Sequence, residues 1–255
     1  MSCCAGFIES VTRRSAFWLI LCLLSLSVTA VTSYANVLEI KYDGFTVWLD
    51  CDNRGATQFY YNAAADSGSH KRNPRFFIDP DIPKHCQQTA TSSYKRPKGE
   101  TQYDRGHLVP ANHFDGSKQS INQTNFMLNI LPQAANMNRG AWLQTEEIVE
   151  CYRDFEPLDI WGGVIWGDND EDDHFIKSHG VKTPDAFWKV IVRGDRGIAW
   201  IIPNTPDAKR RKLDKYLVSI EGIEALTGLN FDIPADQKSK PHSSSWSIPK
   251  GCDKG

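Results

Sequence analysis

The chain has 255 residues, 40% of them hydrophobic and 24% charged, which is enough for one large domain or two small ones. Its formal net charge at pH 7 is −2. This balance argues against a protein that binds nucleic acid tightly by coating its phosphates, but it suits an enzyme that must release its product.

Residues 1–35 have the pattern of a secretory signal. Arg13 and Arg14 supply the positive region, residues 17–31 are apolar, and Ala35 is a small residue before a cleavage point at Asn36. The apolar run is shorter than the ~20 residues that a membrane span needs. We therefore expect cleavage, a secreted or periplasmic location, and no stable membrane association afterwards. A retained membrane anchor is the alternative.

Four cysteines follow the signal: Cys51, Cys86, Cys151 and Cys252. An even number in an exported protein predicts two disulfides, and three pairings are possible. The Cys-x-x-Cys spacing of a zinc site is absent from this set. Residues 238–255 form a polar tail that Cys252 would tether, and we favour Cys151 as its partner while the other pairings stay open.

The sequence of residues 36–102 predicts strands followed by loops. Apolar alternation over residues 36–62 predicts strands, with a turn at Asp43 and Gly44. Residues 67–75 form a basic, polar loop. Residues 87–102 form a second loop, whose lysines and arginine either steer a polyanion or are simply solvated.

Residues 103–151 hold the densest group of reactive side chains. They contain the run Asp104-Arg105-Gly106-His107, a buried strand at 126–131 that ends at Pro132, and a helix that begins near Asn138. Helical spacing puts Glu146 on the side of Asn138 and places Trp142 in the core. A neutral histidine can take a proton from water near pH 7.

This combination favours metal-assisted hydrolysis of a phosphate ester. An asparagine carbonyl is a hard ligand suited to Mg²⁺, and the arginine can neutralise charge developing on a phosphate. We expect activity to fall at low pH as His107 becomes protonated. The alternative for the four-residue run alone is a surface ion pair between Asp104 and Arg105 beside a structural histidine.

The remaining chain predicts strands and two helices. Residues 160–166 form a buried strand, and residues 186–192 and 198–202 form a hairpin. Residues 207–217 are expected to form a basic helix, and a second helix starts after Ser219 as its N-cap. The acidic run 168–173 lacks the glycine and closing glutamate of an EF-hand, so a solvated loop is favoured over a calcium site.

Four motifs together resemble the DNA/RNA non-specific endonucleases, which are ββα-metal nucleases. They are DRGH at residues 104–107, NILPQ at 129–133, NRGAW at 138–142, and Glu146. The resemblance covers roughly residues 40–232. It implies an α+β fold with a mixed, mainly antiparallel central sheet, flanking helices and a ββα-metal (His-Me finger) catalytic unit.

The resemblance also implies roles for single residues. His107 would be the general base, and Asn138 would be the protein ligand of a hydrated Mg²⁺, with Mn²⁺ as a substitute. The remaining implied site residues are Arg105, Asn129 and Glu146 as catalytic groups, and Asp104, Arg139 and Arg75 in substrate binding. Arg72 is the alternative to Arg75 as the upstream arginine.

These features together predict a secreted, Mg²⁺-dependent endonuclease that hydrolyses DNA and RNA with little sequence specificity. Residues 36–237 would be the endonuclease domain, acting as a monomer or a homodimer. Two alternatives remain. One is a catalytically inactive homologue that only binds nucleic acid, and the other is a secreted small-molecule phosphodiesterase.

Overall fold

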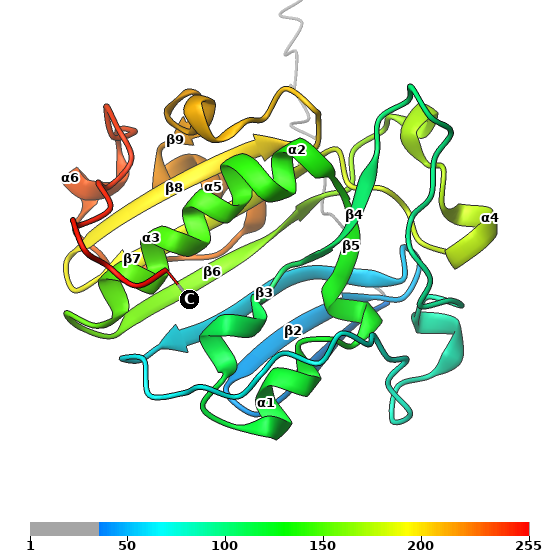
Figure 1. Ribbon diagram of the computed structural model, residues 1–255. Helices are drawn as coiled ribbons and strands as arrows, with labels where there is room; N and C mark the ends of the chain where they lie inside the picture. Colours follow the sequence, from blue (N-terminus) through cyan, green and yellow to red (C-terminus); the bar gives the residue numbers. More distant parts are fainter. Residues whose placement is uncertain (1–35, 255) are drawn as a thin grey trace, which may run out of the picture. The chain divides into compact units, whose positions relative to one another are not determined.

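A seven-stranded antiparallel sheet organises the protein (Figure 1). The structure is a computed structural model that describes residues 36–254, so the expected signal at 1–35 lies outside the described residues. The strand order is β1-β2-β3-β6-β7-β8-β9. The strands are β1 Val37–Lys41, β2 Phe45–Asp50, β3 Gly55–Ala63, β6 Leu158–Ile165, β7 Ala186–Arg193, β8 Arg196–Pro203 and β9 Leu217–Val218.

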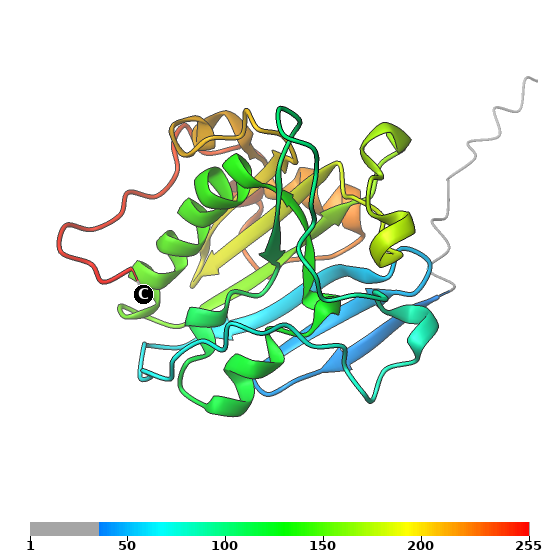
Figure 2. The same ribbon diagram turned by 45° about the vertical axis from the view of Figure 1, so that its right-hand side comes forward.

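A two-stranded sheet and a long helix lie together on one face of this sheet (Figures 1 and 2). Strands β4 (Tyr103–His107) and β5 (Ile130–Ala134) pair antiparallel, with His107 opposite Ile130. The chain then runs through α2 (Ala135–Met137), a π-helical segment η4 (Asn138–Trp142) and α3 (Leu143–Arg153). This is a ββα unit on a mainly antiparallel sheet, so the predicted fold class is confirmed.

The core lies on both faces of the large sheet. The larger cluster lies beneath the ββα unit, where fully buried Trp142 packs against Phe187 with ring centroids 5.5 Å apart. A smaller cluster on the opposite face of the large sheet includes Trp188 and Ile223. It is covered by α5 (Ile220–Thr227), where Ser219 Oγ accepts a hydrogen bond from Gly222 N as the predicted N-cap. Trp142 is therefore a core residue, as predicted.

Shorter elements connect these layers. They are η1 Lys84–Cys86, η2 Ala111–Phe114, α1 Lys118–Gln123, η3 Met127–Asn129, η5 Asp170–Asp172, α4 Ile176–His179, η6 Arg210–Tyr216 and α6 Ala235–Lys238. Within residues 36–254, no helix combines the length and apolar character needed to cross a membrane.

Three expected elements differ in the structure. The strand expected at 126–131 begins with the 3-10 turn η3, and the strand proper starts at Ile130 and continues through Pro132. A proline fits there because β5 belongs to a two-stranded sheet, where one edge needs no ladder hydrogen bond. The following helix begins at Ala135, before Asn138, and the basic helix expected at 207–217 is the 3-10 segment η6.

Two disulfides tie peripheral segments to this framework. Cys51 is joined to Cys86, and Cys151 on α3 is joined to Cys252 in the tail. The favoured pairing of Cys252 is therefore the one found. His85 lies beside the first disulfide, but its two sulfurs are bonded to each other, so this cluster is not a metal-ligand set.

Candidate active site

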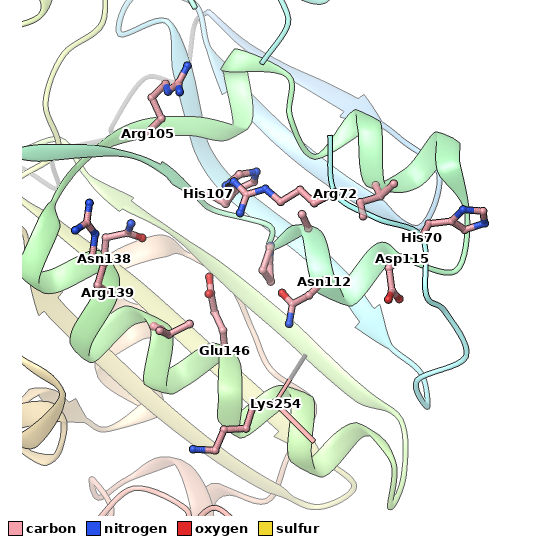
Figure 3. A pocket seen from close by; sticks show the side chains of 14 residues that line it. His70, Arg72, Arg105, His107, Asn112, Asp115, Asn138, Arg139, Glu146 and Lys254 are labelled. Carbon is pink, nitrogen blue, oxygen red and sulfur yellow. Dashed lines mark hydrogen bonds between the residues drawn. The ribbon is translucent and has the colours of Figure 1, made fainter. Parts of the chain in front are cut away.

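One cavity of about 460 Å³ gathers most of the predicted site residues (Figure 3). It lies between β4, the η2 turn and the helix that carries Asn138 and Glu146. The polar residues that line it are His70, Arg72, Arg105, His107, Asn112, Asp115, Asn138, Arg139, Glu146 and Lys254.

The hydrogen bonds of His107 fix which ring nitrogen can act as a base. Asn125 Nδ2 donates to Asn73 O at 2.8 Å, which turns Asn125 Oδ1 toward His107 Nε2 at 2.9 Å. Nε2 therefore carries the proton and donates it to Asn125. The lone pair is on Nδ1, which lies 3.3 Å from an Arg72 guanidinium nitrogen.

Burial keeps His107 neutral. The side chain is almost wholly buried, and desolvation together with the positive charge of Arg72 lowers its pKa to about 3. The hydrogen bond from His107 to Asn125 opposes this shift only in part. The ring is thus unprotonated across the neutral and mildly acidic range, and the same shift makes Nδ1 a weaker base than a free imidazole.

The backbone of His107 is held by two buried side chains. Its carbonyl accepts hydrogen bonds from Trp142 Nε1 at 3.1 Å and from Gln133 Nε2 at 3.2 Å. Gln133 lies so close to β4 that a Cβ on Gly106 would come within 2.2 Å of it. Glycine is therefore required at position 106 to let Gln133 anchor the end of the strand.

Asp104 orients the predicted metal ligand. Its carboxylate accepts a hydrogen bond from Asn138 Nδ2 at 2.9 Å and also binds Arg139 through two nitrogens at 2.6 and 2.8 Å. With its nitrogen held by Asp104, the amide of Asn138 presents Oδ1 toward the cavity (Figure 3). Asn138 opens the π-helical segment η4, a distortion that is frequent at functional sites.

Glu146 faces the same cavity from two turns further along the helix. Burial raises its pKa, and the positive charges of Lys189 and Arg72 partly offset that effect. Lys189 is fully buried on β7, and its Nζ lies 3.8 Å from the centroid of the Trp142 ring. The cavity thus presents a neutral imidazole, a carboxyl group and an amide oxygen, with three arginines, Arg72, Arg105 and Arg139, in its lining.

Comparison with known proteins agrees with this arrangement. Residues 26–238 match the family model described as DNA/RNA non-specific endonuclease. The chain belongs to this family. Because the match covers most of the chain, the family resemblance inferred from the sequence motifs is confirmed.

Several members of the endonuclease family are similar to the chain. Human mitochondrial endonuclease G is 28% identical over 160 residues, which is 58% of this chain and 53% of that protein. Mitochondrial nuclease EXOG of Xenopus laevis is 27% identical over 188 residues, 67% of this chain and 51% of that protein. Nuclease C1 of Cunninghamella echinulata is 24% identical over 177 residues, 64% of this chain and 68% of that protein.

The chain spans about half the length of the mitochondrial relatives it matches. A solved structure of EndoG in complex with EndoGI superposes with a TM-score of 0.61 at 22% identity, covering 78% of this chain and 88% of that chain. At this identity the superposition establishes the shared fold alone.

The structure separates the two upstream arginines of this chain. Arg72 lines the cavity and contacts His107, whereas Arg75 does not belong to the residues that line it. The choice of Arg75 is therefore not supported, and Arg72 takes its place. Arg105 lines the cavity as expected, donates to Thr91 O at 2.7 Å, and stacks 4.1 Å from the Phe76 ring.

Asn129 has a different place from the predicted one. It is fully buried, its Nδ2 donates to the carbonyls of Val109 and Thr124, and its Oδ1 accepts from Val109 N. Its side chain ties Val109, just after His107, to Thr124 at the end of α1, and it does not line the cavity. Asn129 supports the site only through the backbone.

Sequence reasoning missed several residues around the site. Asn125 orients His107, the Nζ of Lys189 lies over the Trp142 ring, and four further polar residues line the cavity: His70, Asn112, Asp115 and Lys254. Asn125 belongs to a segment with several asparagines, and only the hydrogen bond to Asn73 distinguishes it. Lys189 could have been noticed as a charged residue inside an otherwise apolar strand, which is unusual for a buried position.

Proposed function

We propose that the protein is an exported, Mg²⁺-dependent endonuclease that hydrolyses phosphodiester bonds in DNA and RNA with little sequence preference. The observation that carries this proposal is the convergence of a neutral His107 and a cavity-facing Asn138 Oδ1 on one arginine-edged cavity. This set combines a base, a hard oxygen ligand and cations for a phosphate.

The chemistry follows from the tautomer of His107. Nδ1 would take a proton from water as the water oxygen attacks the phosphorus, and the P–O bond to the leaving sugar oxygen would break. The leaving oxygen would take up a proton from solvent, and the hydrogen bond from Nε2 to Asn125 would stabilise the imidazolium. Arg72 and Arg105 are placed to bind the phosphate oxygens and to stabilise the charge that develops on them. Arg72 beside Nδ1 also keeps the imidazole unprotonated before the reaction.

The donor set fits a hydrated magnesium ion. Mg²⁺ prefers oxygen ligands and retains several waters, so Asn138 Oδ1 can be the direct ligand while the Glu146 carboxylate holds metal-bound waters. Asp104 supports this role by fixing the amide orientation. When bound, Mg²⁺ supplies polarisation of the phosphoryl oxygen and stabilisation of the leaving oxygen, and Mn²⁺ is expected to substitute.

Export is supported by the signal pattern and by the two disulfides, which persist in oxidising compartments. We propose a secreted or periplasmic enzyme with the signal at 1–35, the endonuclease domain at 36–237 and a tethered tail at 238–255. It acts as a monomer or a homodimer.

The experiment is digestion of supercoiled plasmid and of RNA by the mature protein, with Mg²⁺ and with excess chelator. We expect nicked and then linear plasmid, degraded RNA, and loss of both activities in chelator without unfolding. Binding of plasmid without cleavage under any divalent metal would instead indicate an inactive homologue. Hydrolysis of small phosphodiesters alone would indicate the phosphodiesterase.

A further inference from the structure

A second hollow lies on the opposite side of the helix that carries Asn138. This outer groove has a volume of about 560 Å³ and is lined by Gln144, Lys209, Arg210 and Arg211. Leu143 lines the active-site cavity, and the next residue, Gln144, lines the outer groove. The first turn of α3 is therefore the ridge that separates the two hollows.

Backbone contacts fix the outer groove relative to the active site. Segment η6, which supplies the arginines, packs on the π-helical segment that begins at Asn138 (Figures 1 and 2). Ala141 N donates to Ala208 O at 3.3 Å, and a Cβ on Gly140 would come within 2.9 Å of Arg210 N. These contacts hold the outer groove at a fixed distance from Asn138, the proposed metal ligand.

Positive charge is concentrated in this groove although the chain as a whole carries −2. Lys209 and Arg211 are exposed. Arg210 binds both carboxylate oxygens of Glu147 at 2.7 Å, and Lys254 of the tail reaches Glu147 at 3.2 Å. Two cations around one carboxylate leave one positive charge, so the outer groove stays positive after its ion pair is counted.

We propose that the outer groove binds the phosphate backbone of the nucleic-acid strand where it continues beyond the cleaved bond. This rests on the proposed endonuclease function and adds a binding subsite to it. A helix with its side chains is about 10–12 Å across, and phosphates advance ~3.4 Å along each strand of duplex DNA. The groove would therefore meet phosphates about three nucleotides from the one at Asn138.

The tail strengthens this subsite. Cys252 is bonded to Cys151 on α3, one helical turn beyond Glu147, and this link brings Lys254 to both the active cavity and Glu147. The tail lies beyond residue 238, where the family match ends. The family match therefore does not cover this contribution to the groove.

The test measures the salt dependence of binding to a 30-base-pair duplex in a His107→Ala background. For B-DNA the steepness of log K against log salt decreases by about 0.9 for each phosphate that the protein no longer neutralises. We expect Lys209→Gln/Arg211→Gln to decrease the steepness by about 1.8 on this rule. Lys177→Gln/Lys240→Gln is the matched control, because it removes two exposed positive charges outside the groove.

A second arm uses substrate length with the active enzyme. The groove variant should lose more kcat/KM on the long duplex than on a tetranucleotide, which is too short to reach the groove. Equal losses of kcat/KM on both substrates would overturn the proposal, and so would a change in the salt-dependence slope no larger than that of the control variant. The partner of the outer groove would then be an acidic protein. If wild-type protein cleaves nothing, the endonuclease assignment fails, while the binding slopes still decide the groove.

Discussion

His107 Nε2 donates to Asn125 Oδ1 at 2.9 Å, and this one hydrogen bond decides which nitrogen of the ring is basic. Asn125 is fully buried and its own amide nitrogen is held by Asn73 O. The imidazole therefore keeps its proton on the side away from the cavity, and its lone pair faces Arg72.

Asn125→Ala should lose part of the ~10²–10⁴-fold rate enhancement that a general base contributes, because the ring can then adopt the wrong tautomer. Asn125→Asp should behave differently. A carboxylate beside Nε2 stabilises the imidazolium and raises the pKa of His107. This effect becomes visible once Glu146 no longer titrates, so Asn125→Asp/Glu146→Gln should lose cleavage at a higher pH than Glu146→Gln alone. Single-turnover rates across pH measure both effects, and identical pH profiles for these two variants would contradict the proposed role.

Glu146, and not His107, should set the acid limb of activity. The pKa of His107 is about 3 because the ring is buried, whereas burial raises the pKa of Glu146 above its usual range. As pH falls, Glu146 should therefore take up a proton first and lose the negative charge through which it is proposed to support the metal. This replaces the simpler expectation that protonation of His107 ends activity.

Glu146→Gln checks this order of titration. The variant should be slower at neutral pH, and its remaining activity should no longer fall in the range where wild type declines. Single-turnover cleavage measured from acidic to mildly alkaline pH would show this. Retention of the wild-type acid limb in Glu146→Gln would assign the limb to another group.

Lys189 is expected to support Glu146 from beneath. Its Nζ is fully buried over Trp142, and among the residues described no hydrogen-bond partner lies within reach of it. Lys189→Met keeps the apolar stem but removes the charge, so the pKa of Glu146 should rise and the acid limb should move to higher pH.

The stability of the same variants separates charge from packing. Removing one member of a fully buried charge pair typically costs about 3–5 kcal/mol, and the loss here should be smaller because Glu146 is only partly buried. Adding Glu146→Gln to Lys189→Met should recover part of that loss. Urea unfolding of the two single variants and the double variant completes the cycle, and strictly additive losses would mean that the two side chains do not interact.

The two disulfides should both be present in mature protein, leaving no free thiol after denaturation without reductant. Cys151→Ser/Cys252→Ser should destabilise the fold by no more than the ~2–5 kcal/mol usual for small secreted domains, because Trp246 also packs on Tyr152 at 5.2 Å. Mass spectrometry and thermal unfolding measure these outcomes. Four alkylatable cysteines in protein from its native compartment would contradict both the pairing and export.

Some of this site was predictable from sequence because its residues are close in the chain or on one helix. His107 and Asp104 belong to one short run, and helical spacing brings Glu146 to the side of Asn138. The seven-strand sheet was partly readable from apolar alternation in β2 and from the apolar runs of β7 and β8. Neither inference needed long-range contacts.

The remaining features depend on tertiary contacts that local patterns do not encode. Arg72 and Arg75 lie on one irregular loop, and only the packing of that loop decides which reaches His107. Asn125 and Asn129 are four residues apart, yet one orients the base and the other ties a buried loop. Pro132 suggested the end of a strand in the sequence. Only the observed pairing of β5 shows that it lies where a proline is tolerated, in a two-stranded sheet.

The most direct test compares His107→Ala with wild type in single-turnover cleavage and in fluorescence-anisotropy binding to the same oligonucleotide. Loss of the base should slow cleavage by about 10²–10⁴-fold while affinity stays near that of wild type, since the proposed phosphate contacts come from Arg72, Arg105 and the metal and not from His107. Cleavage within a few-fold of wild type would show that the base lies elsewhere and would contradict the assignment of His107.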